Sequence, residues 1–149
     1  MLKCSFENGN IASLRHVVVD TIVLNSSKSQ VLLALRSNQI SEGGKWALIG
    51  GYVERDETLV QAVKREVLEE TGYDTTEPQL FKIIDSPNRP KEDRQNISFI
   101  YVCQALKKTG SADWESTQQK WFNFTSLPKS DELAFDHGSA LTDWLSTQN

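Results

Sequence analysis

The chain has 149 residues, of which 38% are hydrophobic, and this is enough for one compact core, so we expect a single domain over residues 1–149. A net charge of -4, from 16 basic and 20 acidic residues, argues against a surface built to bind nucleic acid. No run approaches the roughly 18 apolar residues of a membrane span, and the first residues lack the apolar stretch of a signal peptide, so we expect a cytoplasmic protein without a membrane partner.

Several β-branched or apolar runs predict strands. A polar turn separates the first two runs, as expected of adjacent strands. The third run leads directly into Gly50 and Gly51, and the fifth (ISFIYVCQA) is apolar enough for the middle of a sheet. The expected strands are residues 16–24, 30–35, 46–49, 79–84, 97–105 and 120–123.

Two segments predict helices. Over residues 58–71, Thr58 and Gln61 form a capping box, and Gly72 stands where a left-handed residue would end the helix. The apolar stripe expected on this helix is Leu59, Val60, Val63, Val67 and Leu68. The second helix is expected over residues 139–145, with its core side formed by Leu141, Trp144 and Leu145. Strands and helices in this order predict an α/β fold with a mixed sheet and helices on both faces.

Three glutamates of the first predicted helix point to chemistry. Glu66, Glu69 and Glu70 lie at i, i+3 and i+4, so their carboxylates share one face, roughly opposite the apolar stripe. Like charges at this spacing repel by a few tenths of a kcal/mol per pair, and Arg65 cannot relieve all three. A hard divalent ion such as Mg²⁺ would offset them, because it binds carboxylate oxygens. A solvated acidic face is the alternative for such a cluster.

Glycines and further charged residues extend this pattern. Gly50 and Gly51 permit close approach of the backbone between a strand and a loop. Glu57 stands six residues after Gly51, and Arg65 stands eight residues after Glu57. The complete pattern is Gly51-x5-Glu57-x7-Arg65-Glu66-Val67-x-Glu69-Glu70-x-Gly72-Tyr73.

This pattern resembles the Nudix box of the Nudix hydrolase family, G-x5-E-x7-R-E-U-x-E-E-x-G-U, in which U is a bulky apolar residue. Every fixed position is matched over residues 51–73. Tyr73 is an aromatic variation at the last apolar position, and Ile49 stands where many relatives have proline before the two glycines. The resemblance implies a Nudix-type α/β/α sandwich.

The resemblance also implies Mg²⁺- or Mn²⁺-dependent hydrolysis of a nucleoside diphosphate linked to another group. The metal ligands that it assigns are Glu66, Glu69, Glu70 and the carbonyl of Gly50. Arg65 and Glu57 would orient these carboxylates. Bound metal ions neutralise the charge of a diphosphate and lower the pKa of the attacking water, and a neighbouring carboxylate can take its proton.

The general base is left open by a departure from the family. Many members carry an acidic residue shortly before the tryptophan of the late strand, whereas here Gln118 stands three residues before Trp121. A glutamine cannot accept a proton at neutral pH. The base is therefore Glu115, which is the nearest acid, or one of the box carboxylates, unless the metal alone activates the water.

Substrate selection is expected to depend on residues outside the box. The loop 85–96 carries Arg89, Lys91 and Arg94 between two predicted strands, and a basic loop near a metal site could hold phosphates. The alternative is an ordinary exposed loop, since prolines and charges are common there. Trp46 precedes the glycines and either stacks on a nucleobase or belongs to the core.

The order of this loop, the strand after it and residues 133–137 (LAFDH) is similar to the ADP-ribose pyrophosphatase branch of the family. In this segment His137 is expected to start the last helix in a structural role. The small-molecule substrate expected from this similarity is ADP-ribose or a related nucleotide sugar, cleaved to a nucleoside monophosphate and a sugar phosphate. The first alternative is a nucleoside triphosphate pyrophosphohydrolase. The second is a non-catalytic sensor, which is less favoured because the box acids are intact and no residues remain for a DNA-binding domain. A homodimer is left open.

Overall fold

The computed structural model describes residues 2–89, 95–112 and 114–148. The strands in chain order are β1 (Leu2–Ser5), β2 (Ile11–Leu14), β3 (Val17–Leu24), β4 (Gln30–Arg36), β5 (Trp46–Ala47), β6 (Ile49–Tyr52), β7 (Tyr73–Thr75), β8 (Gln79–Ile84), β9 (Ile97–Lys108) and β10 (Ser116–Asn123). The helices are α1 (Leu59–Thr71) and α2 (His137–Ser146), and a short 3-10 helix covers Phe124–Ser126. Neither α-helix in the described part of the chain is long and apolar enough to cross a membrane.

Strand β3 lies at the centre of an eight-stranded mixed sheet. The sheet order is β10-β4-β3-β9-β7, with β5 paired to β4, β6 to β3 and β8 to β9. β3 and β9 run parallel, from Val17 opposite Ile97 to Leu24 opposite Gln104. The pairings of β3 with β4 and with β6 are antiparallel. All residues of β3 after Val17 are buried, which explains why the strand is apolar apart from Asp20 and Thr21. The predicted mixed sheet is confirmed.

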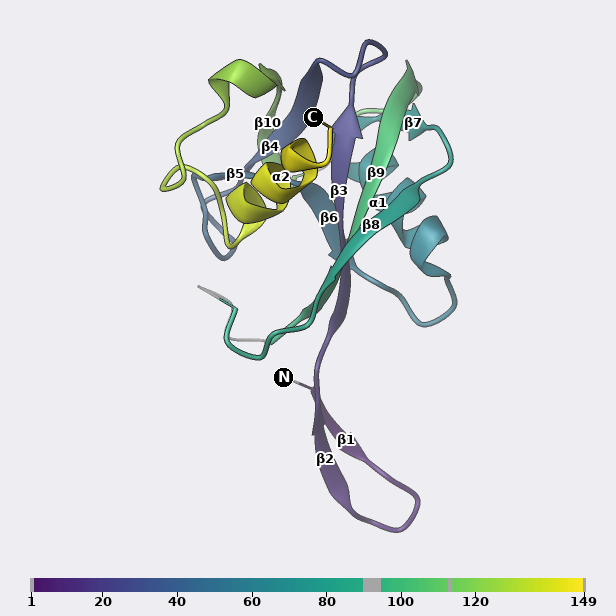
Figure 1. Ribbon diagram of the computed structural model, residues 1–149. Coiled ribbons are helices and arrows are strands. Elements are labelled where there is room, and N and C mark those ends of the chain that lie inside the picture. Colours follow the sequence, from purple (N-terminus) through teal and green to yellow (C-terminus); the bar gives the residue numbers. More distant parts are fainter. Residues whose placement is uncertain (1, 90–94, 113, 149) are drawn as a thin grey trace.

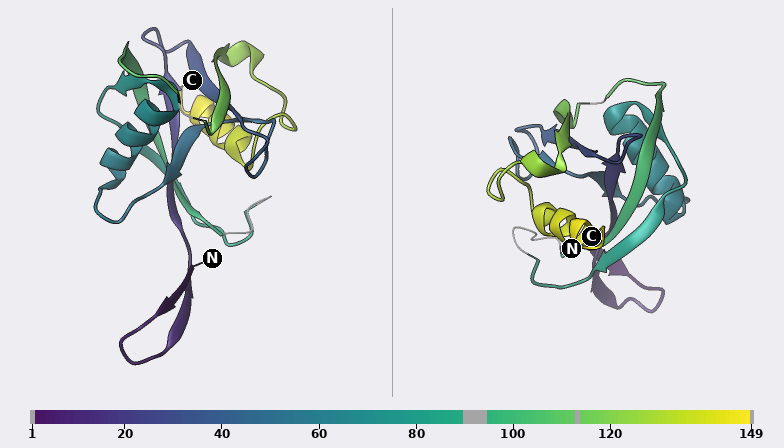
Figure 2. Two further views of the ribbon diagram at one scale, coloured as in Figure 1. Left: turned by 180° about the vertical axis from the view of Figure 1, so that it is seen from behind. Right: turned by 45° about the horizontal axis from the view of Figure 1, so that its top comes forward.

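The helices cover opposite faces of this sheet, as Figure 1 and Figure 2 show. Because side chains alternate along a strand, β3 contributes to two cores. Val19 and Val23 pack on the α1 side, whereas Ile22 and Leu24 pack on the α2 side. This arrangement is the α/β/α sandwich that the sequence predicts.

Helix α1 begins and ends where its sequence indicates. Thr58 is the N-cap, and its side chain and that of Gln61 form both bonds of a capping box. Gly72 ends the helix with a φ of 75°, and a Cβ there would collide with the backbone of Gly110. One part of the predicted apolar stripe is wrong, because Leu68 is 39% exposed.

Several elements differ from the predicted ones. β1 and β2 form a separate two-stranded sheet that projects from the rest of the molecule (Figure 1), and β7 is also additional. The run predicted as one strand over residues 46–49 is interrupted at Leu48, whose N–H donates to Nδ1 of His137 at 3.0 Å. The glycines that follow belong to strand β6 rather than to a loop. β10 begins earlier than expected because residues 116–119 also pair with β4.

Candidate active site

A cavity of about 620 Å³ lies beside the glycines of β6. Helix α1 contributes Glu66 and Glu69 to its lining. Arg36, at the end of β4, lines it as well, together with Phe135 just before α2 and His137 at the start of α2. The cavity therefore joins the box to parts of the chain that are far from it in sequence.

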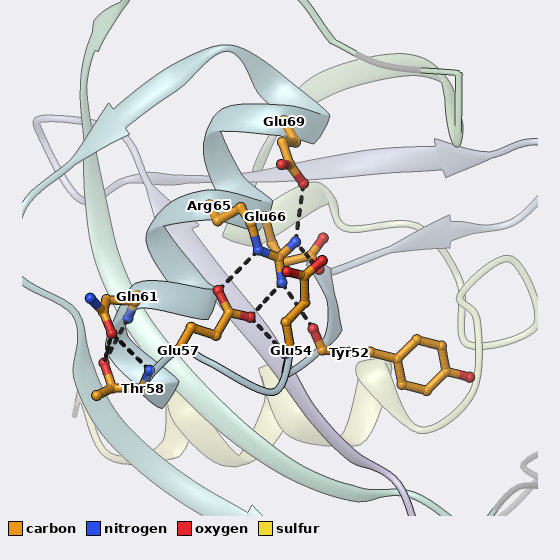
Figure 3. Close-up of polar contacts among 8 residues, drawn as sticks. All are labelled: Tyr52, Glu54, Glu57, Thr58, Gln61, Arg65, Glu66 and Glu69. Atoms are coloured by element: carbon orange, nitrogen blue, oxygen red, sulfur yellow. Dashed lines mark hydrogen bonds and ion pairs between the residues drawn. The ribbon is translucent and has the colours of Figure 1, made fainter.

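Arg65 lies at the centre of an acid cluster beside this cavity (Figure 3). The acid cluster consists of Glu57, Arg65, Glu66, Glu69 and Glu70. Nε and Nη2 of Arg65 donate to the two carboxylate oxygens of Glu57 at 3.0 and 2.7 Å. Nη1 donates to Glu66 at 2.8 Å and to Glu69 at 3.1 Å. One guanidinium thus contacts three carboxylates, and these contacts raise the pKa of Arg65.

The backbone of β6 contacts the remaining box carboxylates. The N–H of Gly50 donates to Oε1 of Glu70 at 3.0 Å, and Glu70 is buried. A Cβ on Gly51 would collide with the carboxylate of Glu66, and a Cβ on Gly50 would collide with the backbone carbonyl of Val19. The two glycines therefore allow α1 to bring its glutamates against the strand. Only part of the predicted acidic face is solvated.

The pKa values of two members of the acid cluster shift in opposite directions. Burial raises the pKa of Glu66 to about 7, although the charge of Arg65 opposes the rise. Hydrogen bonds from Arg65 hold the pKa of Glu57 below its ordinary value. Burial at Glu66 therefore disfavours negative charge, and a cation placed beside it would favour the ionised form.

The chemistry of the box donors fits a hard divalent cation. Glu66, Glu69 and Glu70 offer carboxylate oxygens, which Mg²⁺ and Mn²⁺ prefer as ligands. Within the described residues, no group of three or more His, Cys, Asp or Glu side chains is already arranged to hold a metal ion. Arg65 contacts one carboxylate oxygen of Glu66 and one of Glu69, so each of these groups also has an oxygen that Arg65 does not contact. The Glu69 side chain is 50% exposed and can rotate without unpacking the core.

Glu115 also lines the cavity, directly before β10. Its negative charge contributes to the raised pKa of Glu66, so these two carboxylates are electrostatic neighbours. The backbone carbonyl of Glu115 accepts from the N–H of Ser37 at 2.9 Å. Gln118 is exposed on β10 and is not among the described residues that line the cavity. The structure brings Glu115 to the site, and its role as a base stays a prediction.

A second group of polar side chains at the cavity was not predicted as a unit. This buried polar cluster consists of Asp20, Arg89, Ser98, Asp136 and His137. Arg89 forms a bidentate pair with Asp136, with Nε–Oδ2 and Nη2–Oδ1 distances of 2.9 and 2.7 Å. Nε2 of His137 lies 3.4 Å from Oδ1 of Asp20, and the hydroxyl of Ser98 donates to the other oxygen of Asp20.

The neighbours of the buried Asp20 hold the pKa of its carboxyl group below the ordinary value. Burial alone would raise the pKa of Asp20, but His137, Ser98 and the charge of Arg89 together lower it. His137 is the first residue of α2 and is buried, and it bonds the Leu48 N–H, so it begins the last helix as expected, and its structural role stays a prediction. One signal of this cluster was present in the sequence, since Asp20 is an acid within the otherwise apolar run of β3.

The residues predicted to select the substrate lie in different surroundings. The Arg89 side chain lines the cavity and is only 4% exposed, so the exposed-loop alternative is wrong for this residue. Lys91 and Arg94 lie outside the described residues. Trp46 is not among the described cavity-lining residues, and its ring packs edge-on against Phe122, with centroids 4.9 Å apart, in the α2-side core.

Known proteins match both the sequence and the fold. The NUDIX domain model matches residues 14–144. The ADP-ribose pyrophosphatase of Methanocaldococcus jannaschii is 33% identical over 133 residues, which cover 89% of this chain and 75% of that protein. A bifunctional NMN adenylyltransferase/ADP ribose pyrophosphatase from Francisella tularensis, complexed with AMP and a Mn ion, has a TM-score of 0.72 at 27% identity, with 93% of this chain and 44% of that chain covered.

The fold also matches the NUDIX domain of Shewanella oneidensis NrtR, which was solved with ADP ribose. The TM-score is 0.75 at 21% identity, and 93% of this chain and 91% of that domain are covered. Nudix hydrolases generally use divalent metal ions and act on small nucleotide substrates. The family match spans the box, the sheet and most of α2. The chain therefore belongs to the Nudix family and is a Nudix hydrolase.

Proposed function

We propose that this Nudix hydrolase cleaves the diphosphate of ADP-ribose or a related nucleotide sugar. The products are a nucleoside monophosphate and a sugar phosphate, and the reaction requires Mg²⁺ or Mn²⁺. The observation that carries the proposal is the acid cluster in the wall of a cavity of about 620 Å³, a volume typical of small-molecule sites. The identity to the M. jannaschii ADP-ribose pyrophosphatase supports this choice of substrate.

The acid cluster is assigned to metal binding in this proposal. The ligands are Glu66, Glu69, Glu70 and the carbonyl of Gly50. A bound divalent ion neutralises the anionic diphosphate and lowers the pKa of water. Arg65 bonds to both Glu66 and Glu69 and so keeps these two carboxylates close together. Glu57 retains its two bonds to Arg65 throughout and so keeps the guanidinium positioned.

The proton of the attacking water is assigned to Glu115 or to a box carboxylate. Glu115 lines the same cavity and is exposed, so its carboxylate can move toward the water. Its charge is close enough to contribute to the pKa of Glu66. Arg89 lines the cavity but is paired with Asp136, so we assign it to shaping the phosphate side of the site. Lys91 and Arg94 remain proposed phosphate contacts.

A substrate panel tests this proposal. ADP-ribose, other nucleotide sugars, dinucleotides and nucleoside triphosphates are incubated with Mg²⁺ or Mn²⁺, and the products are identified. We expect the highest kcat/KM for ADP-ribose or another nucleotide sugar, with a nucleoside monophosphate among the products. We expect EDTA to abolish turnover and added Mg²⁺ to restore it.

Two outcomes would replace the proposal. Release of pyrophosphate from triphosphates at a higher kcat/KM would identify a nucleoside triphosphate pyrophosphohydrolase. Tight binding of ADP-ribose without turnover, measured by calorimetry in the presence of Mg²⁺, would identify a sensor. Glu70→Gln serves as the matched negative control in the panel, because it keeps the side-chain shape and removes the charge.

A further inference from the structure

Arg36 and Phe135 form a cation–π pair in the lining of the cavity. Arg36 ends β4, and Phe135 lies just before α2, yet Cζ of Arg36 is 5.0 Å from the centroid of the Phe135 ring. Both residues line the same cavity as Glu66 and Glu69. The pair therefore belongs to the volume that the acid cluster borders.

The fold holds both partners of this pair in place. Nε of Arg36 donates to the backbone carbonyl of Ser41 at 2.7 Å, which fixes the guanidinium. Phe135 has a φ of 50°, a left-handed conformation that is unusual for a bulky residue. Its neighbours are fixed by the bonds from the Ala134 N–H to the Trp46 carbonyl and from the His137 N–H to the Ala134 carbonyl. Backbone strain of this kind is concentrated at ligand sites.

Neither hydrophobic core holds the Phe135 ring, which contacts the ring of His137, with centroids 5.5 Å apart. Phe135 belongs to neither of the two core clusters, and it is half-buried. By contrast, Trp46 packs within the α2-side core. A large aromatic ring kept at a strained backbone position and directed to a cavity is more useful for binding than for stability.

The chemistry of the pair suits a flat, π-bonded ligand. Nucleobases stack on aromatic rings and on the plane of an arginine guanidinium. Gln39 and Ser41 line the same cavity, and an amide and a hydroxyl can both donate to and accept from the edge of a base. The combination provides a stacking surface with polar groups beside it.

We propose that the Arg36–Phe135 pair is the nucleobase subsite of this cavity. In this arrangement the base stacks on the pair and the diphosphate lies at the acid cluster. The placement of the diphosphate rests on the proposed function. The ligand class is a nucleoside monophosphate or any nucleotide that contains one. AMP alone is therefore a sufficient probe.

The test compares ligands with and without a base. Arg36→Ala and Phe135→Ala are measured with ADP-ribose as substrate and with AMP and ribose 5-phosphate as inhibitors. We expect KM for ADP-ribose and Ki for AMP to rise about 5- to 100-fold, as for loss of one stacked base. Ki for ribose 5-phosphate should stay within about twofold, and kcat should change little, because stacking is equal in ground and transition states.

Conservative variants and matched controls separate stacking from folding. Arg36→Lys keeps the charge but loses the plane, and Phe135→Leu keeps apolar bulk but loses the ring, so both should show most of the loss. Arg55→Ala and Phe6→Ala change an exposed arginine and an exposed phenylalanine that do not line the cavity, and they should leave Ki for AMP unchanged. Melting temperatures are recorded for every variant.

Three outcomes are informative. An unchanged Ki for AMP in Arg36→Ala and Phe135→Ala would overturn the subsite, as would equal weakening of AMP and ribose 5-phosphate. Calorimetric titration with AMP measures binding without turnover, so it tests the subsite separately from the hydrolase function. A protein that binds AMP through Arg36 and Phe135 but cleaves no nucleotide of the panel would keep the subsite and reject the hydrolase function.

Discussion

The acid cluster and the buried polar cluster lie at one cavity but are built in opposite ways. Every member of the acid cluster lies within residues 57–70. The period of α1 brings the four members on the helix together, and Glu57 lies just before the helix. The buried polar cluster joins residues 78 positions apart at Ser98 and Asp20 and 47 positions apart at Arg89 and Asp136. A local pattern therefore builds the first cluster, and the tertiary fold builds the second.

The two clusters also differ in how their charges are compensated. Three carboxylates share the guanidinium of Arg65, and Glu69 is half exposed, so the acid cluster can exchange partners. Arg89 and Asp136 form a buried bidentate pair whose loss leaves an uncompensated charge. We expect the acid cluster to control activity with little effect on stability and the buried polar cluster to control stability.

The largest expected effect is at Glu66. Glu66→Gln should lower kcat about 1,000-fold, because several kcal/mol of metal-assisted charge stabilisation are lost. Its melting temperature should change little, because the amide oxygen can still accept from Arg65. Glu77→Gln, at an exposed pair with Lys64, is the matched control and should keep normal kcat. Retention of a third or more of the kcat in Glu66→Gln would contradict the metal site.

Arg89 tests the expectation that the buried polar cluster controls stability. Arg89→Ala should lower the free energy of unfolding by about 3–5 kcal/mol, because the Asp136 side chain, which is only 12% exposed, is left without its cation. Lys82→Ala breaks the half-exposed pair with Asp143 and should cost less than about 1 kcal/mol. Urea denaturation measures both, and Asp136→Asn added to Arg89→Ala should recover part of the loss. An equal loss in the free energy of unfolding for the two alanine variants would show that the buried pair stabilises the protein no more than the half-exposed pair does.

The variant Glu115→Gln tests whether the general base lies outside the acid cluster. If Glu115 takes the proton, Glu115→Gln should lower kcat about 100-fold at saturating Mg²⁺. Its melting temperature should not change, because the residue is exposed. A loss of less than threefold would eliminate Glu115 and transfer the role to a box carboxylate or to metal-activated water.

The two glycines of β6 give the smallest and most selective effect. Gly51→Ala places a methyl group against the end of the flexible Glu66 side chain, so the protein should fold and lose about 10- to 100-fold in activity. Gly50→Ala places it against the backbone of β3 and should instead destabilise the protein by about 1–3 kcal/mol. Thermal unfolding and kcat/KM measured on both variants give the comparison. The same stability loss in both would show that Gly51 has no separate role.

Local signals account for the parts of the fold that could be predicted. Helix α1 carries its own start and end signals in Thr58, Gln61 and Gly72, and all three act as predicted. The strand expected over residues 79–84 coincides with β8. The hairpin of β1 and β2 was missed because its four-residue strands carry few β-branched residues. The break at Leu48 was missed because its cause, His137, lies 89 residues away.

In the site, too, only the contacts within a local sequence pattern could be predicted. The box placed Glu57, Arg65 and the three glutamates of α1 in one group, and the structure shows them in contact with Arg65 or with β6. Nothing in the loop sequence indicated that Arg89 would be buried against Asp136. The stacking of Arg36 on Phe135 likewise depends on the approach of two segments that are distant along the chain.

The sequence by itself determined the family, the helix that carries the acids and the mixed sheet. It could do so because helix periodicity, caps and glycine spacing act over a few residues and leave a pattern that can be read locally. Only the tertiary structure decided that Glu70 accepts a hydrogen bond from the Gly50 N–H of β6 and that Asp20, Arg89 and His137 are buried together. Burial and ion pairing depend on which segments meet across the sheet, and this is a property of the whole packed fold.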